Sequence, residues 1–450
     1  MAVTRSIIGM LWSSTYIAGS CSPSHIGRRM TQPPQPSLLG LEPSFGFGDR
    51  LGLATPGHHA ALRHGKLLPV FAQQSVRELS RTQRTAPEVL AAARAGITAC
   101  HYAGVWGADA DHLKTREDVE TLAEAGFTFF TIDPSAYVQN QADFFTQTEL
   151  LSAVQKLIKD GAFESISEIE SLYSGKKFDL GDNIALSFDD RAKLLRAVVK
   201  YGAAIAYAAK MSQWITEARK GKGADVEVSV DETDSPTTPI EHLFIGLELR
   251  RRGVVATSVA PRFIGEFEKG IDYKGDLARF EEELKVHAAI ARHCGPYKIS
   301  IHSGSDKFSI YPAVGRVCGK LLHVKTAGTS YLEALRVVAR TDADLFREIV
   351  EYSRGRFDTD KATYHISAKL TDAPSAGVLS SKDAENVYLD QVAGRQILHV
   401  TFGSVLTVGR TASGRSFKEG ILEILNNHPD LHSEVLEKHL GKHIKLLSQG

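Results

Sequence analysis

The stretch DLARFEEELKVHAAIARHCGPYKISIHSG, residues 276–304, contains one repeat of the pattern that decides the fold. Residues 276–293 form a long helical pattern, and residues 298–301 form a short apolar run that is typical of a buried parallel strand. A helix that leads into such a strand indicates an α/β unit. The strand ends directly in His302, at the end where such sheets carry reactive side chains.

The same alternation of short apolar runs and long helical patterns extends along most of the chain. Strands are predicted at residues 68–72, 128–132, 226–230, 254–260, 298–301, 321–324 and 363–366. Helices are predicted at residues 86–95, 190–220, 239–252, 276–293 and 331–340. Seven or eight strands favour a closed, TIM-like (β/α)8 barrel over an open sheet. Neither a GxGxxG motif nor a P-loop motif follows any of these strands, which argues against dinucleotide-binding and P-loop proteins.

Differences in composition along the chain predict its domain organisation. Residues 1–38, which include Met30 as a second possible start, are predicted to be a disordered or mis-annotated N-terminal extension rather than a secretion signal. Residues 39–374 are predicted to form the barrel, with a charged helical insertion at about 138–222. Residues 375–450 are predicted to form a mixed α/β extension, whose amphipathic final segment packs on the barrel or on a partner.

The composition limits the class of protein. The 450 residues carry 53 basic and 53 acidic side chains, and this balance argues against nucleic acid as the main partner. No apolar run reaches the roughly 18 residues of a membrane-spanning helix. Four cysteines without a CxxC pair argue against a disulfide framework or a thiolate zinc site. We therefore expect a cytoplasmic protein that binds a small molecule, with a homo-oligomer left open.

Residues 107–115, GADADHLKT, bring two carboxylates, an imidazole and an ammonium together within nine residues. Such a cluster is typical of a functional site. The alternative is that Asp109 or Asp111 caps a helix and that His112 is exposed. A cap accounts for one aspartate but not for the whole cluster, so the pattern favours a site.

Two further runs place charged residues just after predicted strands. Asp231 and Glu232 follow one strand, as expected for a general base or a metal ligand. Arg262 follows the next strand and could bind an anionic substrate, because a guanidinium recognises carboxylates well. The alternative is a surface salt bridge among Arg262, Glu266 and Lys269.

Histidines on successive strands predict a metal site. His302 ends one strand, and His323 lies on the next strand with Lys325 just beyond it. A lone histidine on a strand is usually a buried core residue. Two of them, together with His112, indicate a three-histidine site for Zn²⁺, Mn²⁺, Ni²⁺ or Co²⁺. Tyr364 and His365 end a later predicted strand, and His365 is a reserve ligand.

Several of these segments together resemble the tagaturonate epimerase family, over roughly residues 40–410. The resemblance rests on separate motifs, so it is more specific than any single one. The motifs are FGFGDR (45–50), DADHLKT (109–115), VDETDSPT (230–237), APRFIGE (260–266), IHSGSDKF (301–308) and HVKTAGTSY (323–331).

The resemblance implies a divalent-metal-dependent epimerase that interconverts D-tagaturonate and D-fructuronate in hexuronate catabolism. These keto acids differ at C3, two bonds from the C5 carbonyl. Simple enolisation exchanges protons only beside the carbonyl, so it cannot invert C3. Retro-aldol cleavage, rotation of the aldehyde fragment and re-addition can do so, with a metal at the carbonyl and two acid/base groups. Transient oxidation at C3 is a second route, and the missing nicotinamide motif counts against it.

The resemblance also gives the candidate residues roles. The expected metal ligands are His112, His302 and His323. Asp111 is expected to accept a proton and Glu266 to donate one, with Glu232 as substitute donor or fourth ligand. The residues expected to bind the substrate carboxylate are Arg262, Lys307 and Lys325.

Other functions stay open. The same scaffold could epimerise free ketohexoses (fructose and tagatose at C4), or serve another metal-dependent sugar isomerase or aldolase. A Schiff-base aldolase would use Lys325 at a strand end, but would not need the histidines. A non-catalytic sugar-acid-binding protein would have the same pocket, but would not need paired acid/base carboxylates.

Overall fold

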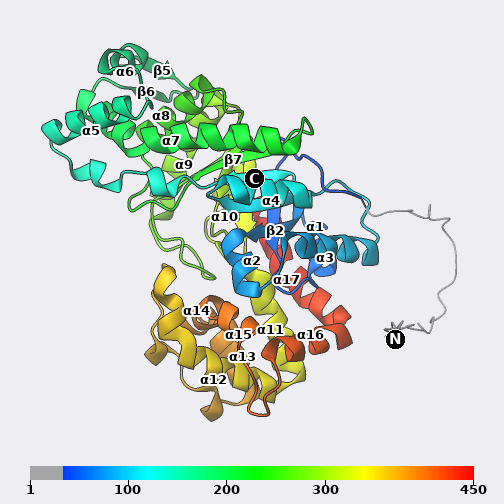
Figure 1. Cartoon of the computed structure of the whole chain (residues 1–450). Coiled ribbons are helices and arrows are strands. Elements are labelled where there is room, and N and C mark those ends of the chain that lie inside the picture. The colour runs from blue at the N-terminus through cyan, green and yellow to red at the C-terminus, as the bar shows by residue number, and fades with distance from the viewer. Residues whose placement is uncertain (1–33, 450) are drawn as a thin grey trace, which may run out of the picture. The chain divides into compact units, whose positions relative to one another are not determined.

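Eight short parallel strands close into a barrel in the computed structural model, which describes residues 34–449 (Figure 1). Around the barrel the strands follow the order β1-β10-β9-β8-β7-β4-β3-β2, and every neighbouring pair is parallel. Their bounds are Ser44–Gly48 (β1), Leu68–Ser75 (β2), Gly107–Leu113 (β3), Phe129–Ile132 (β4), Asp225–Val230 (β7), Ser258–Pro261 (β8), Lys298–Ile301 (β9) and Leu322–Thr326 (β10). The predicted (β/α)8 barrel is confirmed.

A ring of helices surrounds these strands. Its members are Thr55–Leu62 (α1), Ala86–Ala99 (α3), Arg116–Ala125 (α4), Arg191–Arg219 (α7), Pro239–Arg251 (α8), Leu277–Cys294 (α9), Tyr311–Cys318 (α10) and Pro429–Leu447 (α17). Each of these helices packs against the next, and α17 packs against both α10 and α1. The C-terminal helix α17 is therefore the barrel helix that closes the ring. A short helix, Val76–Thr82 (α2), lies between β2 and α3.

Two long segments interrupt the alternation of strands and helices. Between β4 and α7 lie Ser135–Tyr137 (η1), Asn140–Phe144 (η2), Gln147–Lys159 (α5), Ile166–Tyr173 (α6) and an antiparallel hairpin, Lys177–Asp179 (β5) with Ala185–Ser187 (β6). Between β10 and α17 lie Thr329–Thr341 (α11), Ala343–Asp360 (α12), Lys361–Thr363 (η3), Leu370–Asp372 (η4), Ala376–Val378 (η5), Ser381–Leu389 (α13), Val392–Val400 (α14), Phe402–Thr407 (α15) and Phe417–Asn427 (α16). Helices α11–α16 share a second hydrophobic cluster and gather in one group (Figure 1). No helix within residues 34–449 is both long and apolar enough to cross a bilayer.

Side-chain caps start the helices that follow the site strands. Thr238 caps α8 by accepting a hydrogen bond from the backbone of Glu241, whose carboxylate accepts one from the backbone of Thr238. The same capping box at Thr115 starts α4. Because Thr115 caps that helix, Asp109 and Asp111 are not caps but residues of strand β3.

The structure differs from the sequence predictions in four respects. Strands β1 and β3 are not among the predicted strands, and the predicted strand at residues 363–366 is irregular after η3. The insertion predicted at about 138–222 includes α7, which is a barrel helix, and the β5–β6 hairpin. Residues 375–449 form helices and no strand, instead of mixed α/β structure, and α17 among them belongs to the barrel. Most of the predicted N-terminal extension, residues 1–33, lies outside the described residues.

An ion-pair cluster joins α17 to the rest of the barrel. His439 on α17 contacts Asp306 through Nε2, and its Nδ1 lies 3.3 Å from Glu333 Oε1 on α11. Asp306 also pairs with Arg395 of α14 at 2.7 Å. Burial alone would lower the pKa of His439, and Arg395 also lowers it, but Glu333 and Asp306 raise it above its ordinary value. The folded protein therefore binds a proton at His439 more tightly than the unfolded chain does.

This cluster predicts a pH-dependent contribution to stability. Because the folded-state pKa of His439 is raised, the contact stabilises the fold fully below the ordinary histidine pKa, and its contribution is lost as the pH rises through the raised value. We expect His439→Gln to cost about 1.5–3 kcal/mol of unfolding free energy at pH 6 and less at pH 9. Thermal unfolding at both pH values measures this, with the exposed His428→Gln as control. An equal loss at both pH values would contradict the prediction.

Candidate active site

The carboxyl ends of the barrel strands surround two adjoining cavities. The inner cavity has a volume of about 70 Å³ and reaches Asp111 and Lys325 inside the barrel. The outer cavity has a volume of about 340 Å³ and is bordered by Arg262 and Glu266. Both cavities are lined by the residues Arg77, Asp231, Glu232, Lys269, His302, Ser303 and Tyr364. The predicted site at this end of the barrel thus coincides with a continuous hollow.

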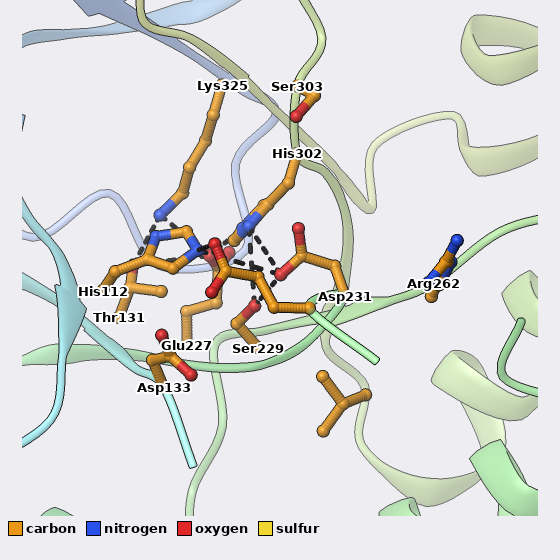
Figure 2. A network of polar contacts seen from close by, with 12 residues as sticks. His112, Thr131, Asp133, Glu227, Ser229, Asp231, Arg262, His302, Ser303 and Lys325 are labelled. Carbon is orange, nitrogen blue, oxygen red and sulfur yellow. Dashed lines mark hydrogen bonds and ion pairs between the residues drawn. The ribbon is translucent and has the colours of Figure 1, made fainter. Parts of the chain in front are cut away.

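Two histidines and one aspartate meet between these cavities (Figure 2). His112 lies on β3, whereas Asp231 and His302 directly follow β7 and β9. Asp231 Oδ1 lies 3.8 Å from His112 Nε2 and 3.2 Å from His302 Nδ1. These spacings suit ligand atoms that each lie about 2 Å from one ion. Two imidazole nitrogens and a carboxylate oxygen are a donor set for a divalent transition metal. We refer to His112, Asp231 and His302 as the metal group.

The electrostatics of the metal group also fit a cation. Burial alone would lower the pKa of His302, but Asp231 and Glu227 raise it to about 10. Burial would raise the pKa of Asp231, but His302 and His112 hold it well below its ordinary value. Without an ion, then, protonated imidazole offsets the buried carboxylates. A divalent ion can take over this role when it replaces the protons.

The ammonium group of Lys325 binds three carboxylates inside the barrel. Lys325 Nζ lies 2.8 Å from Asp109, 2.7 Å from Asp111 and 2.9 Å from Glu227. It also donates to Thr131 Oγ1 at 2.5 Å. Burial alone would lower the pKa of Lys325, but Asp109, Asp111 and Glu227 raise it well above its ordinary value. Lys325, predicted to bind the substrate carboxylate, is thus occupied by carboxylates of the protein.

Two other predicted site residues lie deeper than expected. His323 is fully buried, and its Nδ1 lies 2.9 Å from Ser44 Oγ, with its ring beside Phe129. It lies two positions before Lys325 on β10, below the metal group rather than within it. Lys307 is also fully buried and donates to three backbone carbonyls, at 2.5–3.0 Å. These contacts saturate the Lys307 ammonium, and burial lowers its pKa to about 7.

The predicted proton-transfer residues differ in their access to the cavities. Asp111 is buried between Lys325 and His112. Glu232 borders both cavities, and its Oε1 lies 3.9 Å from His112 Nε2. Glu266 borders only the outer cavity, where it pairs with His365 at 2.5 Å. Of these three residues, Glu232 is therefore the one that borders both cavities, whereas Asp111 reaches only the inner cavity and is engaged by Lys325 and His112.

Besides Arg50 and Lys325, which are buried at the inner cavity, three basic side chains border the cavities. Arg262 borders the outer cavity, donates to the carbonyl of Thr233 and lies to one side of the metal group in Figure 2. Lys269 borders both cavities and donates to Ser303 Oγ at 2.6 Å. Burial lowers the pKa of Lys269. Arg77 on α2 also borders both cavities. Of these three, only Arg262 was predicted as a substrate ligand.

Three residues of the site, Glu227, Lys269 and Arg77, were not predicted from the sequence, and Asp109 was predicted only as part of the cluster at residues 107–115, without a role. Glu227 and Asp109 are fully buried carboxylates within strands β7 and β3. Their pattern was visible, since a polar residue inside an apolar strand must have a partner. Lys269 was visible only as part of a salt-bridge motif, and nothing in the sequence around Arg77 indicated a site.

Comparisons with known proteins agree with this geometry. A family model described as tagaturonate epimerase matches residues 25–447. The tagaturonate/fructuronate epimerase of Thermotoga maritima is 46% identical over 417 residues, which cover 92% of this chain and 82% of that protein. Crystal structures of the fructuronate-tagaturonate epimerase of Cohnella laeviribosi, native and with one glycerol bound, match with a TM-score of 0.86 and 39% identity, over 92% of this chain and 83% of theirs. With its barrel and its mouth-side cluster of histidines and carboxylates, this chain belongs to the tagaturonate epimerase family.

Proposed function

We propose that this protein interconverts D-tagaturonate and D-fructuronate with a divalent metal held by His112, Asp231 and His302. The observation that carries the proposal is the metal group, which lies at the junction of an inner polar cavity and an outer cavity large enough for a sugar acid. The activity for which the relatives are named, at 39–46% identity over most of the chain, supports the choice of substrate.

The reaction inverts C3 of the keto acid by retro-aldol cleavage and re-addition. A base removes the proton of the C3 hydroxyl, the C3–C4 bond breaks, and its electrons form an enediolate with the C5 carbonyl. The aldehyde at C3 turns over, C4 attacks its other face, and the new C3 oxide takes up a proton. A bound divalent metal supplies a Lewis acid for the oxygen that becomes negative.

Glu232 is the residue that exchanges the proton with the C3 hydroxyl in this proposal. It faces both cavities, and its half-exposed carboxylate lies beside His112 without being held in the barrel network. Asp111, by contrast, is engaged by Lys325 and His112, so it serves the site through His112. Glu266 is left as the candidate for the opposite face of the hydroxyl, in the outer cavity.

Lys269 binds the carboxylate of the substrate in this proposal, with Arg77 and Arg262 nearby. The Lys269 ammonium donates a hydrogen bond to Ser303 Oγ and borders both cavities. Lys307 and Lys325 already donate to several protein oxygens each. A neutral ketohexose would not use this contact, which separates the two substrate classes.

The reaction and its metal dependence can be tested together. Protein saturated with Mn²⁺, Co²⁺, Ni²⁺ or Zn²⁺ in parallel samples is expected to convert D-tagaturonate into D-fructuronate, and EDTA-treated protein is not. Product analysis by NMR measures this, with D-fructose as a parallel substrate. Conversion of D-fructose alone would show a free-ketose epimerase instead. Binding of the uronate without conversion by any metal form would show a binding protein.

Two variants test whether Asp231 or His323 binds the metal. Loss of a residue that only hydrogen-bonds to a metal ligand typically lowers metal affinity roughly 10–100-fold. Asp231→Asn is expected to lower it by more, because this variant removes a direct ligand. His323→Asn is expected to keep the metal, since His323 lies below the metal group. Metal content after dialysis, measured by mass spectrometry, decides between the two sets. Loss of metal in His323→Asn and retention in Asp231→Asn would restore the three-histidine site.

The proton-transfer role of Glu232 predicts a specific kinetic change. Glu232→Gln keeps the shape of the side chain but cannot accept a proton, so we expect kcat to fall roughly 10²–10⁴-fold while KM and metal content change little. Steady-state kinetics in both directions measure this. Glu266→Gln is the comparison, and a larger loss there than in Glu232→Gln would assign the main role to Glu266.

The carboxylate-binding role of Lys269 predicts a change in specificity. Lys269→Met is expected to raise KM for D-tagaturonate roughly 10–100-fold, the loss of one charge-assisted hydrogen bond. Any slow turnover of D-tagatose, which has no carboxylate, is expected to stay the same. The exposed Lys66→Met before β2 serves as control. An equal effect of Lys269→Met on both sugars would contradict a contact with the carboxylate.

A further inference from the structure

One ammonium group connects four strands of the barrel interior. Lys325 on β10 reaches Thr131 on β4 and Glu227 on β7 (Figure 2). It also reaches Asp109 and Asp111 on β3, and all four contacts are 2.5–2.9 Å long. Lys325 is 4% exposed and Glu227 is fully buried. The ammonium donates hydrogen bonds to Asp111 and Thr131 and forms ion pairs with Asp109 and Glu227, so four side chains compete for its three N–H groups.

Two of the three carboxylates each contact one histidine of the metal group. His112 Nδ1 donates to Asp111 Oδ1 at 2.9 Å, and His302 Nε2 donates to Glu227 Oε1 at 2.7 Å. In each imidazole, the other nitrogen faces Asp231. The same arrangement therefore occurs twice. In each case the Lys325 ammonium contacts a carboxylate, and that carboxylate contacts an imidazole of the metal group.

The hydrogen bond between each imidazole and its carboxylate decides which of the two imidazole nitrogens can bind a metal. A neutral imidazole that coordinates through one nitrogen carries its proton on the other, and a carboxylate acceptor fixes that proton in place. Asp111 therefore leaves Nε2 of His112 as the ligand atom, and Glu227 leaves Nδ1 of His302. Each carboxylate must keep one orientation for this to hold.

Lys325 can supply that orientation. Carboxylates this close together repel one another, and one ammonium between them offsets the repulsion and fixes the oxygens that face it. Ser258 holds the second oxygen of Glu227 at 2.5 Å. We propose that Lys325 is a positioning residue, which orients Asp111 and Glu227 so that His112 and His302 present the correct nitrogens to the metal. This inference rests on the metal group of the proposed function.

The third carboxylate provides a matched control. Asp109 is fully buried and lies 2.8 Å from Lys325 Nζ, as Glu227 does at 2.9 Å. Asp109 bonds to Thr131 and contacts no histidine. If the network serves only to hold the barrel together, Asp109→Asn and Glu227→Gln should have similar effects. If it positions the ligands, only Glu227→Gln should change the metal site.

The test uses Co²⁺ as a probe of the full-length protein, without reference to turnover. Glu227→Gln and Lys325→Met are each expected to lower Co²⁺ affinity about 10–100-fold, measured by competition with a chelator, and to shift the visible absorption bands of bound Co²⁺. Asp109→Asn is expected to keep the wild-type spectrum and to change Co²⁺ affinity by less than about threefold, well below that range. Circular dichroism and thermal unfolding report folding of each variant.

The positioning role would be overturned if Asp109→Asn and Glu227→Gln changed Co²⁺ affinity and spectrum equally. It would also be overturned if neither variant changed them. If Lys325→Met does not fold, the Glu227 and Asp109 pair decides, because both replace a carboxylate beside the same ammonium. Wild-type protein that binds no Co²⁺ would overturn this inference and the metal group together. Conversion of D-tagaturonate, which NMR follows separately, would still report on the reaction itself.

Discussion

The ion cluster of Lys325 with Asp109, Asp111 and Glu227 is the constraint on which the site depends. Removing an ion from water costs several kcal/mol, and attraction between partners offsets this only when the geometry is good. Most (β/α)8 barrels fill their interior with layers of branched apolar residues. This barrel instead has buried charges near the carboxyl ends of its strands, and these charges orient the imidazoles of His112 and His302. The free-energy cost of burying these charges is thus linked to the orientation of the metal-binding imidazoles at the mouth of the barrel.

The connectivity of the chain explains how the mouth is covered. Helices α11–α16 are inserted between the last strand, β10, and the last barrel helix, α17, so the group is anchored to the barrel at both ends. Tyr364 and His399, from this inserted group, border the inner cavity. Because α17 packs between α10 and α1, the ring of helices is completed by a helix that follows the inserted group in the sequence. Fold closure and site construction therefore depend on the same C-terminal segment.

The sequence predicted those strands that contain a short apolar or β-branched run, including β7 and β10, which carry charged side chains inside the barrel. Strand β9 was predicted with its observed bounds, because its short apolar run follows a clear helix. Strands β1 and β3 were missed because glycines interrupt the apolar residues of β1 and aspartates interrupt those of β3. In β1, a Cβ on Gly46 would lie 1.8 Å from Oε1 of Gln73, so glycine is needed where a strand would normally have a bulky residue. In β3, the inward residues Asp109 and Asp111 give the sequence the composition of a loop.

For the residues on and after β7, β9 and β10, position relative to the strand end separates the site predictions that fit the geometry from those that do not, whereas His112 belongs to the metal group from within β3. His302 and Glu232 lie one and two residues beyond their strands, and both border the cavities. His323 and Lys325 lie within β10, so their side chains point into the barrel, where their partners come from strands far away in sequence. A sequence shows how far a residue lies along its strand, but not which residue faces it across the barrel. For interior residues, that opposite partner decides whether a lysine binds a ligand or holds the protein's own carboxylates in place.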